Sequence, residues 1–350
     1  MRYRLLGRCG LRVSEICLGT MTFMDTLPWG TTREESRRIF ETFAEAGGNF
    51  VDTSGNYACS EEYLGEFMGS ARQRFVIGTK YTGSEATTDP NSSGNHRKSL
   101  IAAVEASLRR LRTEYLDILW LTAWDGMTPA DEIMRSLDDL VRMGKLLYVG
   151  ASNTPAWFVA RANMLAELRG WTPFVGLELC YNLLQREAER ELLPMARALD
   201  LGVTAWTPLA GGYLTGKYRE PAAVAAGPRR LDDPIASRFV ARTPKNAAIV
   251  EELAAVASAV GCSPAQAALN WLRQRRVIPI VGARSAGQLA DDLDCLRFPL
   301  AAEHLQRLDQ VSASPLGYPH DFLAAGMVKQ HLFGGMFAAI DNHRLVGSGI

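Results

Sequence analysis

Short apolar runs alternate along the chain with longer segments in which apolar residues recur every three or four positions. The short runs suit strands buried on both faces, and the longer periodic segments predict amphipathic helices. Leu100, Val104 and Leu108 show the helical spacing within residues 97–111, and residues 116–121 form one of the apolar runs. The pattern therefore predicts an α/β protein.

Eight strands are expected after an N-terminal β-hairpin made by residues 3–6 and 14–17. The strands are 16–18, 50–51, 75–79, 116–121, 147–149, 174–179, 203–206 and 277–280. The helices are 31–46, 60–68, 97–111, 129–143, 155–169, 190–199, 245–260, 264–275 and 285–296. This alternation predicts a (β/α)8 TIM barrel; the runner-up, a doubly wound sheet, would favour a GxGxxG turn after the first strand, and none is present.

No linker divides the chain, so residues 1–350 are interpreted as a single barrel domain. Residues 219–243 are rich in Ala, Pro and Arg and are expected to form a surface insertion. Residues 312–350 are Gly-rich with apolar patches and are expected to form a C-terminal extension. This tail could be a lid, an oligomer contact or a loosely packed extension.

Composition excludes several classes of function. The formal net charge is zero and there is no basic block, so neither nucleic acid nor a membrane surface is an expected partner. No apolar run approaches the ~20 residues of a membrane span. The N-terminus does not resemble a signal peptide, and six dispersed cysteines suit a reducing compartment, so a cytoplasmic protein is expected. The five dispersed histidines predict no metal site.

Asp52, Tyr57 and Lys80 lie at the ends of two successive strands, where a barrel carries its chemistry. Singly, each has a structural explanation as a turn cap, a surface aromatic or a solvated ammonium. Together they suit proton transfer, because an ammonium lowers the pKa of a tyrosine from its usual value of about 10 and a carboxylate holds the ammonium in place. We therefore interpret them as one site.

Several ordered motifs resemble the aldo-keto reductase family over roughly residues 1–325. They are Leu18-Gly19-Thr20-Met21, residues 48–53 with Tyr57, residues 76–80, Gly94-Asn95-His96-Arg97, and residues 115–119, 144–153, 206–218 and 278–284. Within the family the chain is most similar to the bacterial group that resembles potassium-channel beta subunits. The resemblance implies a (β/α)8 barrel that binds NADP(H) and reduces aldehydes or ketones.

The resemblance also implies roles for single residues. Tyr57 matches the proton donor, Lys80 the group that lowers its pKa, and Asp52 the residue that positions Lys80. The implied cofactor residues are Ser152, Asn153 and Glu178 at the carboxamide, Trp206 on the nicotinamide ring, Thr207, Leu209, Gly211, Thr215 and Lys217 at the pyrophosphate, and Gly282, Arg284, Ser285, Gln288 and Asp292 at the adenosine. Arg284 favours NADP over NAD, because a guanidinium suits a 2′-phosphate. Phe23, Trp29 and Trp124 are expected to line an apolar substrate pocket.

Two positions depart from the family pattern. Thr122 stands where the family has a catalytic histidine, and a threonine hydroxyl donates one hydrogen bond but does not titrate near pH 7. Glu178 stands where a glutamine usually meets the carboxamide, and a carboxylate there would favour the oxidised, cationic ring.

These departures leave several functions open. The chain is expected to be a carbonyl reductase of a small organic substrate that tolerates Thr122. Alternatively, it reduces a C=C or imine bond, or catalyses a redox-neutral dehydration, isomerisation or epimerisation through bound NADP, in a specialised-metabolite pathway. It could also sense NADP(H) with little turnover. A homo-oligomer is possible in each case.

Overall fold

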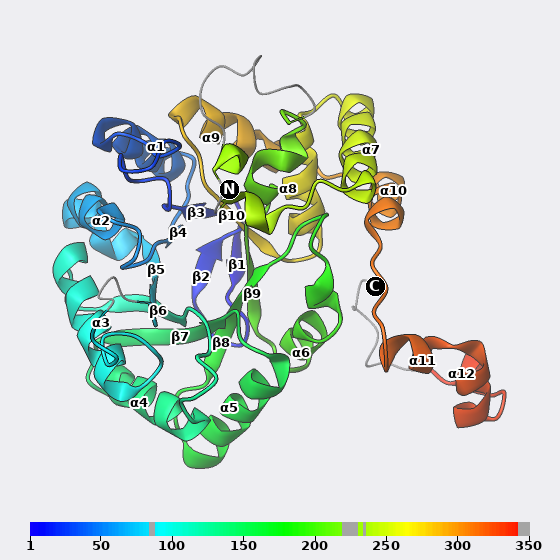
Figure 1. Ribbon diagram of the computed structural model, residues 1–350, viewed down its shortest axis with the longest axis horizontal. Helices are drawn as coiled ribbons and strands as arrows, with labels where there is room; N and C mark the ends of the chain where they lie inside the picture. Colours follow the sequence, from blue (N-terminus) through cyan, green and yellow to red (C-terminus); the bar gives the residue numbers. More distant parts are fainter. Residues whose placement is uncertain (84–87, 219–229, 234–235, 342–350) are drawn as a thin grey trace.

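Eight parallel strands close into a barrel with helices on the outside in the computed structural model (Figure 1). In barrel order they are β3 (Cys17–Gly19), β4 (Phe50–Asp52), β5 (Val76–Tyr81), β6 (Leu116–Leu121), β7 (Leu146–Ser152), β8 (Phe174–Cys180), β9 (Gly202–Trp206) and β10 (Ile278–Val281), which pairs with β3. The prediction of a (β/α)8 barrel is confirmed. The structure describes residues 1–83, 88–218, 230–233 and 236–341.

The helices follow the apolar periodicity of the sequence. They are α1 (Arg33–Glu45), α2 (Ser60–Met68), α3 (Arg97–Leu111), α4 (Ala130–Arg142), α5 (Ala156–Arg169), α6 (Leu192–Ala198), α7 (Pro244–Val260), α8 (Pro264–Gln274) and α9 (Ala286–Leu293). An additional helix that was not predicted, α10 (Ala302–Ser312), packs against α7. Within the described residues no single helix is long and apolar enough to span a membrane, and α7 with α8 passes that test only as a pair bent by 94°.

The N-terminal hairpin closes the end of the barrel where the strands begin. Its strands are β1 (Tyr3–Leu5) and β2 (Arg12–Ser14), so the hairpin forms as predicted, but its second strand lies earlier than the expected residues 14–17. The backbone N–H of Arg8 donates to the carbonyl of Asp200, just before β9, over 2.7 Å. Leu6 and Val13 are fully buried among the side chains inside the barrel. The opposite end, where the strands finish, is therefore the end left for a site.

Trp120 of β6 fills the middle of the barrel. It is fully buried, and glycines on three strands face its indole ring. A Cβ at Gly78 would lie 2.5 Å from the Trp120 Nε1, a Cβ at Gly150 would come closer still to the ring, and one at Gly176 would lie 3.1 Å away. Because only glycine leaves room for the indole, the ring forms an apolar floor beneath the polar strand ends.

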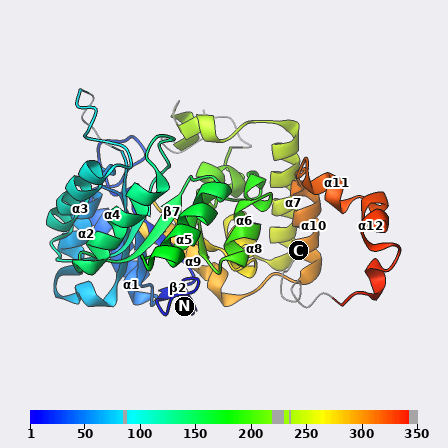
Figure 2. The same ribbon diagram turned by 90° about the horizontal axis from the view of Figure 1, so that it is seen from below.

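The segment after β9 and the C-terminal tail take different courses. Within residues 219–243, η5 (Arg230–Asp232) and η6 (Ala236–Phe239) lie against the barrel, and Leu231 is only 5% exposed, so the described part is more than a surface insertion. Residues 219–229 and 234–235 of that segment lie outside the described residues. The tail forms α11 (His320–Ala324), α12 (Gly326–Phe333) and η8 (Phe337–Ala339), which extend beyond α10 and away from the strand ends (Figures 1 and 2). The described tail is therefore not a lid over the site.

Candidate active site

Asp52 and Lys80 form a buried ion pair at the ends of β4 and β5. The Lys80 Nζ donates to the Asp52 Oδ1 and Oδ2 over 2.5 and 2.6 Å and to the carbonyl of Thr53 over 3.0 Å. Burial alone would lower the pKa of Lys80, but the Asp52 and Glu178 carboxylates raise that pKa above its usual value. Lys80 is therefore a fixed cation at neutral pH, as the sequence analysis expected.

Tyr57 lies on the loop between β4 and α2, with the Lys80 ammonium 5.5 Å from the centroid of its ring. Its backbone N–H donates to the carbonyl of Ser54 over 3.0 Å, which fixes the loop close to the end of β4. The expectation of a lowered pKa is wrong for this structure: burial raises the pKa of Tyr57 to about 12, and Asp52 and Glu178 offset the lowering effect of Lys80.

Glu178 of β8 belongs to the same charged cluster. It is 3% exposed, and its Oε1 lies 3.4 Å from the Lys80 Nζ. Burial, followed by repulsion from Asp52, raises the pKa of Glu178 to about 8. Glu178 was expected at the carboxamide alone, whereas the structure brings it to Lys80 across the barrel.

The hydroxyl of Thr122 is already engaged. Thr122 follows β6, and its Oγ1 donates to the carbonyl of Tyr81 at the end of β5. A threonine hydroxyl has one proton, so in this conformation the Oγ1 offers a ligand only acceptor capacity. Thr122 thus lies at the strand ends as predicted, but its hydroxyl proton is not available to a ligand.

Ser152 and Asn153 join the ends of three neighbouring strands. The Asn153 Nδ2 donates to the Thr122 carbonyl over 2.8 Å and to the Ser152 Oγ over 3.0 Å. The Ser152 Oγ in turn donates to the carbonyl of Glu178 over 2.9 Å. This chain of hydrogen bonds holds the ends of β6, β7 and β8 in fixed positions beside the charged cluster.

Most of the remaining predicted cofactor residues follow β9. Trp206 ends that strand, Thr207 and Leu209 come next, Gly211 and Thr215 lie in η3 (Ala210–Thr215), and Lys217 follows η3. Gly211 and Gly212 have φ values of 63° and 89°, a region that L-residues with side chains rarely adopt. A Cβ at Gly212 would lie 2.6 Å from the Lys217 Nζ. Gly212 therefore lets the Lys217 ammonium approach the backbone of this turn closely.

The other predicted cofactor residues follow β10. Gly282 and Arg284 are exposed, and Ser285 caps α9 by accepting from the Gln288 N–H over 3.1 Å. The Gln288 Oε1 accepts from the Arg284 backbone N–H over 3.0 Å. Asp292 of α9 is buried, and burial with repulsion from Asp291 raises its pKa to about 7, against the opposing charge of Lys217. β9 and β10 are neighbours, so the two groups of residues form one continuous rim.

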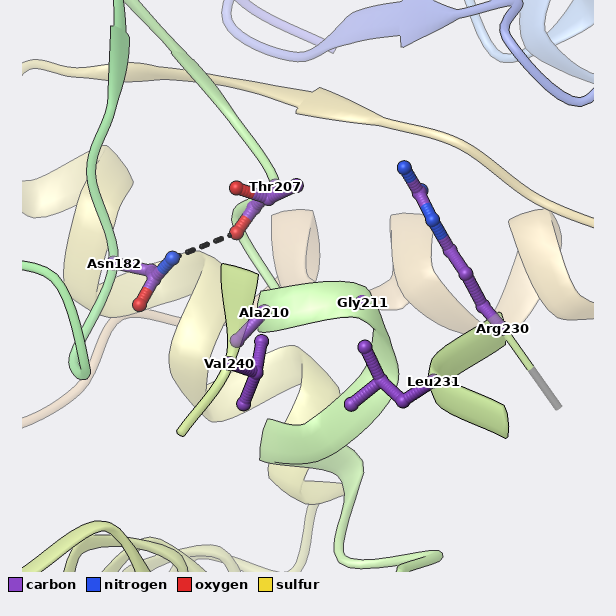
Figure 3. A pocket seen from close by; sticks show the side chains of 7 residues that line it. All are labelled: Asn182, Thr207, Ala210, Gly211, Arg230, Leu231 and Val240. Carbon is purple, nitrogen blue, oxygen red and sulfur yellow. Dashed lines mark hydrogen bonds between the residues drawn. The ribbon is translucent and has the colours of Figure 1, made fainter. Parts of the chain in front are cut away.

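Arg230 is a site residue that the sequence analysis missed. Together with Asn182, Thr207, Gly211 and Leu231, among others, it lines a hollow of about 280 Å³ that includes open solvent (Figure 3). Its guanidinium lies 4.8 Å from the centroid of the Trp29 ring. Tyr57 is close enough for each charge to affect the pKa of the other. An arginine inside an Ala- and Pro-rich segment carried no signal that could have shown this placement.

The three predicted substrate residues lie in different environments. Phe23 is fully buried and packs on Phe67, with ring centroids 6.4 Å apart, so it belongs to the core and does not line a pocket. Trp29 is 4% exposed beneath Arg230. Trp124 is half-buried after β6 and stacks on Phe158 with ring centroids 4.6 Å apart. Trp124 is the one of the three that forms an accessible apolar wall.

Comparisons of the sequence with a family model and with known proteins point to the same family. The model of the aldo/keto reductase family matches residues 15–313. An aryl-alcohol dehydrogenase of Pestalotiopsis microspora is 33% identical over 339 residues, covering 93% of this chain and 86% of the relative. Norsolorinic acid reductase of Aspergillus flavus is 32% identical over 335 residues, covering 91% and 83%. An aldo-keto reductase of Emericella nidulans is 36% identical over 343 residues, covering 91% and 84%. The barrel, the Asp52–Lys80 pair beside Tyr57 and these matches together show that the chain belongs to the aldo-keto reductase family.

Proposed function

We propose that this protein is an NADP(H)-dependent oxidoreductase that reduces the carbonyl of a small organic substrate, with Tyr57 as proton donor. The observation that carries the proposal is the phenol of Tyr57 beside the buried Lys80–Asp52 pair, at the end of the barrel where the strands finish. A cation held in a dry site can stabilise the phenolate that forms when Tyr57 gives up its proton. When bound, the coenzyme would supply the hydride.

The residues at the rim suit a dinucleotide with a negatively charged pyrophosphate. Lys217 and Arg230 bring two cations to the turn at Gly211 and Gly212, whose backbone a Cβ would obstruct. The buried Asp292 Oδ2 has no hydrogen-bond partner among the described residues, which leaves an acceptor for a polar ligand group. We assign Ser152, Asn153 and Trp206 to the nicotinamide end and Arg284 to the 2′-phosphate, which favours NADP over NAD.

The substrate class follows from the apolar wall and from the relatives. Trp124, with Trp157 5.3 Å away in an edge arrangement, offers aromatic surface after β6. Two of the relatives are named for aryl alcohols and for norsolorinic acid. We therefore propose an aromatic aldehyde or ketone as substrate. We further propose that the protein is cytoplasmic and belongs to the group similar to potassium-channel beta subunits; the six free cysteines agree with a reducing compartment.

Tyr57→Phe tests the proposal directly. The variant should lose about 10²- to 10⁴-fold in kcat, the usual contribution of a general acid, and should bind NADPH as the wild type does. Steady-state oxidation of NADPH with aromatic aldehydes measures the first, and fluorescence titration of NADPH measures the second. Tyr115→Phe is the matched control, because Tyr115 lies before β6 at the opposite end of the barrel and packs on Arg72. Full turnover by Tyr57→Phe would exclude Tyr57 as the proton donor.

A second candidate is favoured by the engaged hydroxyl of Thr122. If nothing beside Tyr57 donates to a carbonyl oxygen, the substrate could instead be an activated C=C or imine bond, or could be converted without net redox change. A panel that includes enals, cyclic imines and aromatic aldehydes separates the two. Conversion of an enal to the saturated aldehyde, and not to the allylic alcohol, would favour the second candidate.

A further inference from the structure

The Glu178 carboxyl has an unusual environment for a charged group. The Lys80 ammonium has three protons, and its three hydrogen bonds go to the Asp52 Oδ1, the Asp52 Oδ2 and the Thr53 carbonyl. Glu178 receives none of these, and its Oε1 is only in ion-pair range of the ammonium at 3.4 Å. Its Oε2 is buried and has no hydrogen-bond partner among the described residues. A buried carboxylate without a donor is costly, so the neutral acid is the favoured form.

The groups around Glu178 come from several elements of the barrel. Asp52 of β4 and Lys80 of β5 are the charged groups that affect it most: repulsion from Asp52 raises the pKa of Glu178, and the Lys80 ammonium lowers it. The charge of Glu178 also raises the pKa of Cys17 of β3. Tyr57 lies beside the cluster, and its pKa is raised by Glu178 and lowered by Arg230 of η5. With Glu178 neutral, the one remaining carboxylate and the ammonium cancel; with Glu178 ionised, the cluster carries a net negative charge.

We propose that Glu178 holds a dissociable proton beside the Asp52–Lys80 pair and that its charge state sets the acidity of Tyr57. This inference rests on the proposed role of Tyr57 as proton donor. A second negative charge next to the phenol opposes formation of the phenolate. Protonated Glu178 therefore leaves one negative charge fewer beside the phenol, which favours the phenolate that proton donation to a substrate produces. Glu178 is a positioning residue in this scheme: it acts through Lys80 and Tyr57 and transfers no proton to the substrate.

The same charge works in the opposite sense for the reverse reaction. An ionised Glu178 raises the proton affinity of the phenolate, which favours Tyr57 as a base. Raising the pH through the ionisation of Glu178 should therefore lower the reductive rate relative to the oxidative rate. The raised pKa of Glu178, about 8, places this change within the accessible range of pH.

The test uses direct titration of Tyr57 in the protein without added coenzyme. The tyrosinate absorbance of the wild type minus that of Tyr57→Phe isolates the ionisation of Tyr57. The same difference, measured in a Glu178→Gln background, should show Tyr57 as about a tenfold stronger acid, because the variant removes a nearby negative charge but keeps the size of the side chain. Glu187→Gln, which removes an exposed carboxylate further along the same connection, should leave the titration unchanged.

An unchanged or weaker acidity of Tyr57 in Glu178→Gln would overturn the proposal. A second readout does not depend on Tyr57: the infrared difference between wild type and Glu178→Gln should contain the carbonyl stretch of a protonated carboxylic acid at pH 6 that disappears as the pH is raised to 10. Absence of that band at pH 6 would also overturn it. Neither measurement needs turnover, so failure of the carbonyl reductase assignment would show in the Tyr57→Phe kinetics and not here.

Discussion

Replacing Thr122 with valine separates a catalytic hydroxyl from a structural one. The Thr122 Oγ1 donates its single proton to the Tyr81 carbonyl at the end of the neighbouring strand. Valine has the same shape and removes only the hydroxyl. Because the proton is committed within the protein, we expect Thr122→Val to alter stability more than it alters turnover.

The magnitudes of the two effects are far enough apart to decide the question. Loss of one hydrogen bond to a backbone carbonyl should lower the free energy of unfolding by about 0.5–1.5 kcal/mol. Loss of a donor that polarises a substrate carbonyl typically lowers kcat by about 10²- to 10³-fold. We therefore expect kcat/KM of Thr122→Val to lie within about threefold of the wild type, since the interaction removed is the same in ground and transition states.

Urea unfolding and steady-state oxidation of NADPH with an aromatic aldehyde measure the two quantities. Thr154→Val is the matched control, because the Thr154 Oγ1 donates to the Ser152 carbonyl over 2.8 Å in the adjacent loop. Both variants should lose similar stability. A hundredfold fall in kcat for Thr122→Val, without a similar fall for Thr154→Val, would show that the hydroxyl turns to the substrate and would refute the structural reading.

Four further outcomes are expected. Arg230→Met should weaken binding of NADPH about tenfold or more by removing a charge-assisted contact, whereas Arg238→Met, on the exposed side of η6, should not; equal affinities in a fluorescence titration would remove Arg230 from the site. Gly150→Ala should lower the free energy of unfolding by about 1–3 kcal/mol, since its methyl group meets the Trp120 ring, and an unaltered urea midpoint would contradict this. The pKa of Asp292 in the folded state is raised to about 7, so the free energy of unfolding falls as the pH rises from the ordinary pKa of an aspartate toward 7. Asp292→Asn lacks this loss, so its stability relative to the wild type should increase between pH 4 and pH 8; a stability difference that does not change with pH would count against the raised pKa. Removing residues 314–350 should reduce self-association measured by light scattering, because the tail exposes Tyr318, Met327 and Met336 among other large apolar side chains. Unchanged scattering would show that the tail makes no contact between copies of the chain.

The sequence allowed the barrel to be predicted because each buried strand is a short apolar run between polar ends. The run at 116–121 matches β6 at both ends. β7 was placed at 147–149 but extends over Leu146–Ser152, because Gly150, Ala151 and Ser152 carry no strand signal of their own. These three residues belong to the strand because they pair with β6 and β8. The presence of a strand can be predicted from its own residues, whereas its length depends on the strands with which it pairs.

Interactions across the barrel are harder to predict than its strands. Lys80 and Glu178 lie on β5 and β8, which are separated by two strands in the barrel order. No spacing in the sequence reports that their side chains meet in the middle. The raised pKa of Tyr57 has the same origin, since the sequence suggested the lysine beside it but not the two carboxylates that offset that lysine.

The floor and the charged layer of the barrel depend on each other. Trp120 pairs in register with Lys80 on one side and Gly150 on the other, so the indole and the ammonium project from paired positions of neighbouring strands. The ring turns toward Gly78, Gly150 and Gly176 and seals the interior below the ammonium. Water that would otherwise screen the charges is kept out from beneath, and the effective dielectric constant falls. A proton gained or lost at the Glu178 carboxyl therefore affects Tyr57 more than it would at a solvent-exposed strand end.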